Sequence, residues 1–267
     1  MKKGILGIGS LGVGGLNLGV LGEKEASGGD PADDLFSPSD VGDWWNYTDL
    51  STLNQDSGGA GDPVTAANDP IGYAAGQRSD GGTHINPIQT AGGMKPTAQE
   101  LNSVWAMYTE IGITNYLVGL FASTTTRSMF VLLDPRTPTG LGVSTGATET
   151  ISNVGDAGWK TLAVNDIRIG VDGSSGFTSA IGATSLPTDQ NSVWGIVIRG
   201  VNDAELYLNG VSYATLATYG TPDTVTQYLI GLFHNVRSED IYHRKSLVID
   251  RDLSLAEIQS LTTGWLA

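Results

Sequence analysis

The chain has 267 residues, of which 40 % are hydrophobic, 16 % are charged, 37 are glycine and 10 are proline, as is typical of a loop-rich globular β protein. The absence of cysteine excludes a disulfide framework, thiolate metal sites and a cysteine nucleophile, and three histidines leave little room for a multi-histidine metal centre. The net charge of −14, with no basic patch to offset it, disfavours binding to nucleic acid or to an anionic membrane.

Residues 1–22 combine two lysines with a glycine-rich apolar run, an order that resembles a signal peptide or a short membrane anchor. Glycine, however, occupies 8 of the 19 positions from Gly4 to Gly22. Each of these glycines costs a helix about 1 kcal/mol relative to alanine. Since the chain also starts at Met1, we expect neither cleavage nor a membrane span. We predict an extended arm that becomes ordered on a partner, with a free tail as the alternative.

The apolar side chains of this arm recur every two or three residues, which is too sparse for a core of their own. We predict that they contact a partner protein: Ile5, Leu6, Ile8, Leu11, Leu16, Leu18 and Leu21. Residues 23–35 follow as a polar linker rich in Gly, Pro and Asp. The folded body is predicted to occupy residues 36–267 as one domain.

The body consists of short β-like runs separated by clusters of Gly, Asn, Asp and Pro, a pattern that indicates a β-sandwich or barrel. The candidate strands are Val104–Thr109, Asn115–Ala122, Ser128–Asp134, Asp166–Val171, Val193–Arg199, Ala204–Leu208, Val211–Leu216, Tyr228–Phe233 and Ser246–Asp250. Between two of these runs, the pair Asn209–Gly210 predicts a two-residue type I′ turn and hence a hairpin.

Two short helices are predicted. The first covers Thr97–Asn102. The second, near the C-terminus, starts with a capping box formed by Ser254 and Glu257, in which each side chain bonds the backbone N–H of the other residue. Its apolar stripe is Leu255, Ile258 and Leu261, and we expect the helix to pack on the edge of the sandwich.

The last third of the body resembles the end of a concanavalin A-like, laminin-G-like jelly roll. That family runs from a strand through a polar turn and an "LYLNG" hairpin to an "L-x-I-G" strand and a final strand with "LS-x-x-EI-x-x-L". The same elements stand in order in WGIVIRGVNDAELYLNGVSYATL (194–216), TQYLIGLF (226–233) and SLVIDRDLSLAEIQSL (246–261).

The start of the body resembles a segment common at the start of such domains in phage virion proteins. There, "W-Y-x-x-x-DLSTL-x-QD" is followed by "PVTA-x-x-DP-x-G". The matching residues within 36–72 are Trp45, Asp49–Leu53, Gln55–Asp56, Pro63–Ala66 and Asp69–Gly72. The stretch 75–190 carries no motif that matches. The resemblance implies an all-β fold of two antiparallel sheets, a glycan- or protein-binding module and a place on a phage particle.

Glucanases belong to the same superfamily, and their chemistry makes a specific demand on the sequence. Retaining hydrolysis needs two carboxyl groups about 5–5.5 Å apart, which glucanases of this fold place on one strand as E-x-D-x-x-E or a near variant. No such motif occurs, and we predict no catalytic residues. Glu239 and Asp240 would point to opposite faces of a strand, whereas Asp250 and Asp252 would share a face. Solvated turns with ion pairs to neighbouring arginines are the alternative for both pairs.

A serine–histidine–aspartate triad is not indicated, because none of the three histidines lies near a G-x-S-x-G elbow. Calcium is a further option, because residues 30–69 contain nine Asp and no Lys or Arg, and oxygen-rich loops suit Ca²⁺. The candidate ligands are Asp49, Asp56, Asp62 and Asp69. Aspartate is also favoured in turns, and no EF-hand spacing is present, so turn formation is the alternative.

Aromatic side chains outside the predicted strands are candidates for stacking on sugars, with packing in the core as the alternative. Trp159 lies in a Gly-flanked stretch predicted to be a loop, and Tyr73 lies in a turn-like stretch. The candidate ligand contacts are Trp159, Tyr219, Tyr242 and His243. Core positions are predicted for Trp44, Trp105 and Trp194, surface positions for His84 and His243, and a strand-capping position for His234.

These observations favour a non-enzymatic structural protein of a bacteriophage particle that serves in decoration, as a fibre or in contact with the host surface. Its arm would bind other virion proteins of the capsid or tail, and several copies would be arranged by symmetry, a trimer being one such arrangement. The alternatives are a polysaccharide-binding, lectin-like module outside a virion and a glucanase-type glycosidase. No cofactor is expected, with bound Ca²⁺ as the alternative.

Overall fold

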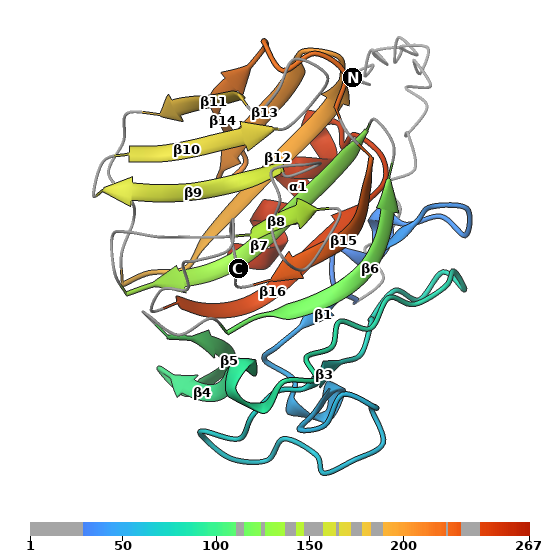
Figure 1. Ribbon diagram of the computed structural model, residues 1–267, viewed down its shortest axis with the longest axis vertical. Coiled ribbons are helices and arrows are strands. Elements are labelled where there is room, and N and C mark those ends of the chain that lie inside the picture. Colours follow the sequence, from blue (N-terminus) through green and yellow to red (C-terminus); the bar gives the residue numbers. More distant parts are fainter. Residues whose placement is uncertain are drawn as a thin grey trace, which may run out of the picture.

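The computed structural model describes residues 29–110, 115–123, 126–136, 143–146, 157–163, 166–171, 178–182, 189–222, 224–230 and 241–267. The predicted arm lies outside these residues, as does His234. Two antiparallel sheets pack against each other, and one helix lies behind the larger sheet (Figure 1). The expected all-β, two-sheet antiparallel sandwich with a short C-terminal helix is thereby confirmed.

The larger sheet has the strand order β14-β13-β12-β7-β16-β5-β4, and β1 also pairs with β16. β16 is central because its first residues pair with β5 and its last residues pair with β1. The strands of this sheet are β1 (Gly42–Asn46), β4 (Thr97–Leu101), β5 (Val104–Thr109), β7 (Arg127–Pro135), β12 (Ser192–Gly200), β13 (Asp203–Leu208), β14 (Val211–Leu216) and β16 (Ile241–Ile249).

The smaller sheet has the order β11-β10-β9-β8-β15-β6, so that β6 forms one of its edges (Figure 1). Its strands are β6 (Leu117–Ser123), β8 (Val143–Gly146), β9 (Ala157–Ala163), β10 (Asp166–Val171), β11 (Thr178–Gly182) and β15 (Val225–Ile230). Single turns of 3-10 helix and a short ribbon complete the described part: η1 (Asp33–Leu35), η2 (Leu50–Thr52), η3 (Gly92–Met94), β2 (Leu53–Asn54) and β3 (Tyr73–Ala74). Between residues 143 and 182 the sequence predicted one strand, Asp166–Val171, which is β10. The structure adds β8, β9 and β11 in this stretch.

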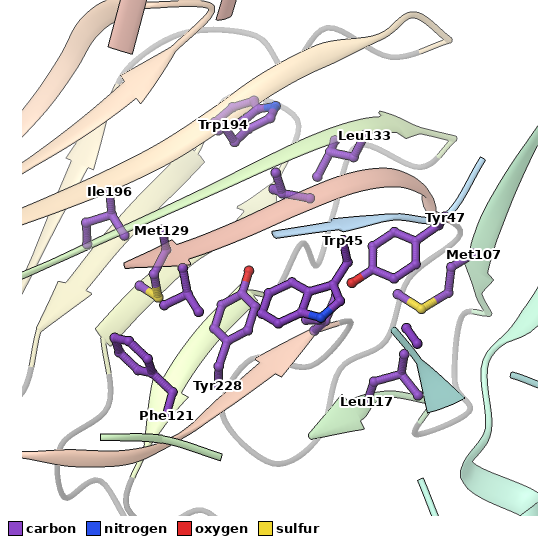
Figure 2. Packing of buried hydrophobic residues seen from close by; sticks show 14 of the residues in the cluster. Trp45, Tyr47, Met107, Leu117, Phe121, Met129, Leu133, Trp194, Ile196 and Tyr228 are labelled. Atoms are coloured by element: carbon purple, nitrogen blue, oxygen red, sulfur yellow. The ribbon is translucent and has the colours of Figure 1, made fainter. Parts of the chain in front are cut away.

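The main core lies between the two sheets (Figure 2). Trp45 of β1 stacks on Tyr228 of β15, with ring centroids 5.5 Å apart and ring planes 18° apart. The indole N–H of Trp45 donates a hydrogen bond of 2.8 Å to the carbonyl oxygen of Ile85. The side chain of Trp45 therefore joins the larger sheet both to the smaller sheet, at Tyr228, and to the loop that contains Ile85. Trp194 is buried in this core as predicted, and Trp105 is half-buried against it.

A second core lies between the larger sheet and α1 (Leu255–Leu266), where Ile258 and Leu261 pack with Trp44. The predicted capping box is present, because Ser254 Oγ accepts from the N–H of Glu257 at 3.4 Å and the Glu257 carboxylate accepts from the N–H of Ser254 at 2.8 Å. The helix covers the outer face of β12 rather than the sandwich edge, and Leu255, predicted in its stripe, is exposed. None of the helices in the described part of the chain is long and apolar enough to cross a membrane.

Two tight turns shape the larger sheet. Asn209 and Gly210 have φ values of 50° and 76° and join β13 to β14, as the predicted type I′ turn requires. The predicted helix over Thr97–Asn102 is wrong, because residues 97–101 form β4. Asn102 and Ser103 have φ values of 53° and 61° and make a second two-residue turn that pairs β4 with β5. Tertiary pairing overrides the helical propensity of the segment.

The surface position predicted for His243 is also wrong, because this side chain of β16 is fully buried. Its Nε2 lies 3.3 Å from Oγ1 of Thr109. Burial lowers the pKa of the imidazole to about 3, since desolvation disfavours the charged ring. The ring is therefore neutral in the folded protein under conditions where an unfolded histidine takes up a proton. His84, in contrast, is exposed as predicted.

This depressed pKa predicts a loss of stability in acid. Because an unfolded histidine titrates near pH 6.5 and His243 near pH 3, the stabilisation is present above pH 6.5 and is lost as the pH falls towards 3. The advantage of the native protein over His243→Gln should therefore shrink by about 2 kcal/mol between pH 7 and pH 4.5. Urea unfolding of both proteins at the two pH values measures this difference, and an unchanged difference would contradict the assignment.

Candidate functional site

A groove of about 720 Å³ lies beside β6, at the edge of the smaller sheet. Three stretches far apart in the sequence form it: residues 38–42, which lead into β1, residues 83–88, and β6 with Thr226 of β15. Two of these stretches are loops without regular hydrogen bonding of their own. Their positions therefore depend on side chains that hold them, and two buried charged residues do so.

The carboxylate of Asp43 holds the wall at residues 83–86. Asp43 lies in β1 and is fully buried. Its Oδ2 accepts from the N–H of Ile85 at 2.9 Å and lies 3.1 Å from Nδ1 of His84. Its Oδ1 accepts from three backbone N–H groups at 2.9 to 3.1 Å, those of Trp44, Gln77 and Arg78. A buried carboxylate needs such donors, so the loop wraps closely around it.

Gly76 permits this close approach, because a Cβ at that position would lie 1.8 Å from Oδ2 of Asp43. The amide N–H of Gly76 donates to Oδ1 of Asn86 at 2.9 Å, which closes the loop on itself. The segment 76–86 is thus a compact loop folded around one negative charge.

The guanidinium of Arg78 holds the opposite wall at residues 37–42. Arg78 is 3 % exposed, and its guanidinium donates at 2.8 to 3.0 Å to the carbonyl oxygens of Ser37, Asp40 and Gly42. It also makes two hydrogen bonds of 2.7 Å to the carboxylate of Asp80. These bonds raise the pKa of Arg78 and lower the pKa of Asp80, so both groups stay charged.

The side of the groove formed by β6 is apolar. Leu120 is 77 % exposed, the most exposed of the large hydrophobic residues in the described part of the chain. Val41 and Ile88, which also line the groove, are exposed as well, and Val118 lies at its base. Exposed apolar residues gathered in one depression and bordered by polar groups are typical of a binding surface.

The described lining of the groove lacks the pair of carboxyl groups that retaining glycosidases use. Asp40 is the one carboxylate among the described lining residues. It accepts from the N–H of Ser37 at 2.8 Å and lies 3.8 Å from Nε of Arg251. Retaining hydrolysis needs two carboxyl groups close together, and the lining offers one. The groove is suited to bind an apolar or extended segment.

The four predicted ligand contacts lie at separate places. Tyr219 is fully buried, where its hydroxyl donates to the carbonyl of Gly200 at 2.5 Å and accepts from the N–H of Asp203 at 2.8 Å. His243 is buried in the core as described above. Neither ring has a face at the surface for stacking on a sugar.

Trp159 lies in β9, so the loop predicted there is a strand. Tyr242 is half-buried on β16, with its ring centroid 4.9 Å from that of Tyr108 and 5.4 Å from the guanidinium carbon of Arg136. Tyr73 is half-buried in β3. As ligand contacts, Trp159 and Tyr242 stay predictions.

Three of the four carboxylates predicted as calcium ligands bond backbone amides in turns. Asp49 caps η2 by accepting from the N–H of Ser51, and Asp56 accepts from the N–H of Gly58 at 2.9 Å. The N–H groups of Thr65 and Ala66 donate to Asp69 and lower its pKa. Asp62 is exposed. No group of three or more His, Asp or Glu side chains in the described residues could hold a metal ion.

The predicted partner contacts of the arm, Ile5, Leu6, Ile8, Leu11, Leu16, Leu18 and Leu21, lie outside the described residues, as do Glu239 and Asp240. Asp250 accepts from the N–H of Val41 at 2.8 Å and so supports the groove wall. Its neighbour Arg251 pairs with Glu257 at 2.8 Å. Asp250 therefore supports the groove wall through a backbone hydrogen bond. The ion pair of Arg251 agrees with the predicted alternative of a turn with local ion pairs.

Asp43, Arg78 and the groove were not identified from the sequence. One signal was present, because Asp43 stands directly before two tryptophans in a strand-like stretch, where a charge requires buried partners. A second was Arg78, the first basic residue after Lys24 in an Asp-rich region. The groove itself gave no local signal, since it is formed by three separate stretches.

Comparison with known proteins supports the fold. No protein-family model matches the chain, and no curated protein matches it. Among solved structures it is similar to a Trypanosoma rangeli sialidase, with 11 % identity, a TM-score of 0.50, and coverage of 86 % of this chain and 36 % of that one.

Two further solved structures are similar at lower TM-scores. The binding domain of Paraclostridial Mosquitocidal Protein 1 has 13 % identity and a TM-score of 0.47, with 74 % of this chain and 52 % of that one covered. The botulinum neurotoxin serotype G binding domain has 14 % identity and a TM-score of 0.44, with 68 % and 49 % covered. The chain spans about half or less of the length of each structure. At these identities the likeness concerns the fold, a β-sandwich.

The role of Asp43 predicts a large loss of stability in Asp43→Asn. An amide cannot accept all four backbone hydrogen bonds, and its NH₂ group faces backbone donors, so buried N–H groups lose their partners. We expect the free energy of unfolding to fall by about 3 kcal/mol, because each unsatisfied buried group costs about 1–3 kcal/mol. Asp62→Asn, a matched change at an exposed position, should alter it by less than about 0.5 kcal/mol. Chemical denaturation compares the variants, and equal effects would refute the proposed role.

Proposed function

We propose that this chain is a non-enzymatic structural protein of a bacteriophage particle, anchored by residues 1–22 and displaying its β-sandwich on the particle. The contrast between a self-sufficient body and an arm that cannot fold alone carries the proposal. The particle supplies the neighbours on which such an arm becomes ordered, and display requires only that the body be stable by itself.

The body supports this proposal because its described residues form two apolar cores of their own. One cluster fills the space between the sheets and a second fills the space beneath α1. The capping box of α1 and the hydrogen bonds of Asp43 are likewise complete within the described residues. The sandwich therefore has the features of a module that remains folded whether or not its arm is bound.

The arm supports the proposal through its composition. Residues 1–22 contain Lys2 and Lys3 and no acidic residue, which gives a charge of +2. The remainder of the chain therefore carries −14 minus 2, or −16. A basic, apolar and glycine-rich segment attached to a strongly acidic body is suited to contact another acidic protein surface.

The resemblance of residues 36–72 to phage virion domains supports a place on a phage particle. The stretch that carries it, residues 36–72, contains β1 with Asp43 and Trp45 and the carbonyl groups that Arg78 binds. The resemblance thus falls on residues that determine the architecture around the groove. It favours a virion over a free lectin-like module, which a glycan array on the purified chain tests independently.

Removal of residues 1–22 should separate folding from assembly. The shortened chain should keep its melting temperature within about 2 °C, because its core is complete. It should, however, be absent from purified particles when it is expressed during infection in place of the full chain. Mass spectrometry of the particles quantifies the incorporation, and normal incorporation of the shortened chain would remove the arm from the account.

A further inference from the structure

Apart from one bridge, no described residue pairs with the outer edge of β6 next to the groove. Val118 exchanges two hydrogen bonds with Ile88, at 2.8 and 2.9 Å, on the side of β6 that faces away from β15. In an antiparallel ladder, alternate residues direct their backbone groups to the same side. The N–H and C=O of Leu120 therefore point to this outer side. Among the described residues, Ile88 provides the single bridge on that side.

The side chains at this edge add an apolar surface to the open backbone groups. Leu120 keeps 77 % of its surface exposed, and the groove that it lines continues past Ile88 to Val41. An edge strand with exposed apolar residues readily accepts a further strand from another chain. Residues 38–42 and 83–86 line the same groove as this strand edge.

The arm of this chain has the pattern of such a segment. Leu16, Leu18 and Val20 alternate with Asn17 and Gly19, so that the three apolar side chains would share one face of a strand. The small residues of the other face allow the backbone to pass close to the walls of the groove. Pairing with β6 would satisfy the backbone groups of both strands.

We propose that residues 16–20 of one copy add as a strand to the outer edge of β6 in a second copy. This inference rests on the proposed function, because it names the site that receives the anchoring arm. The arm charge of +2 complements the charge of −16 on residues 23–267 of the neighbouring copy. The nine residues from Val20 to Gly29 span at most about 30 Å, so the two copies must be direct neighbours.

We assign the arm to a second copy because the particle proposed above holds neighbouring copies of the chain. The described part of the same chain leaves Leu120 77 % exposed. In an assembly, each copy would donate its arm and receive one. Such head-to-tail exchange closes into a ring where the rotation between copies permits it.

The absence of cysteine permits a direct test in the full chain. Leu120→Cys is placed in one protein, and single changes Leu11→Cys, Leu16→Cys and Leu18→Cys are placed in others that carry a different mass tag. After mixing and mild oxidation, we expect disulfide-linked heterodimers between Leu120→Cys and at least one of the arm positions. Val211→Cys, at the exposed edge strand β14, is the matched control and should give at least about tenfold less product.

A second measurement does not depend on register. Sedimentation of the unmodified chain should show association that increases with concentration. Leu120→Lys should weaken this association at least about tenfold, because a lysine would be buried against apolar side chains. Val211→Lys should leave it unchanged. Heterodimers absent at every arm position, together with unaffected association of Leu120→Lys, would overturn the proposal.

Two outcomes separate this inference from the proposed function. If the double variant Leu18→Cys/Leu120→Cys forms its disulfide only within one chain, the arm occupies its own groove and the second-copy proposal fails. If Leu120→Lys enters particles normally while the chain without residues 1–22 does not, the arm binds a different protein. In that case the virion role stands and the groove proposal is overturned.

Discussion

The buried carboxylate of Asp43 is the interaction on which the architecture around the groove depends. It sits in β1 at the end of the larger sheet and accepts hydrogen bonds from backbone groups more than thirty positions along the chain. An ionised group at this depth is tolerated only when its lone pairs are satisfied. The segment 76–86 must therefore fold around it. This fold places the guanidinium of Arg78 where it donates hydrogen bonds to carbonyl groups of residues 37–42. One negative charge and one positive charge thus set both walls of the groove.

The described residues leave one edge of the smaller sheet largely uncovered. The backbone N–H and C=O of Ile85 are hydrogen-bonded to Asp43 and Trp45, respectively. Three residues later, Ile88 makes one bridge to Val118 of β6. Gly119 allows this approach, because a Cβ there would lie 3.0 Å from Cγ2 of Ile85. The groove lies next to this bridge, since both Ile88 and Val118 line it. An exposed apolar strand edge readily pairs with a strand of another chain, which is the pairing that we propose.

Much of the fold could be predicted from the sequence because its determinants are local. The turn at Asn209 and Gly210 and the capping box of α1 each depend on residues a few positions apart. The strand β4 was missed because its partner β5 overrides a local preference for helix. His243 was misplaced because its burial follows from the register of β16 between β5 and β7, which no local pattern reveals. The groove was missed for the same reason, since Asp43 and its partners become adjacent only in the folded chain.

The structure of the assembled particle at near-atomic resolution, determined by electron cryomicroscopy, tests the central claim most directly. The account predicts that backbone density for residues 16–20 lies beside Leu120, between the walls that Asp43 and Arg78 hold, and that it leads to the Gly29 of a neighbouring molecule. Density for these residues on their own sandwich, in lipid or on an unrelated protein, with the edge of β6 empty, would contradict it.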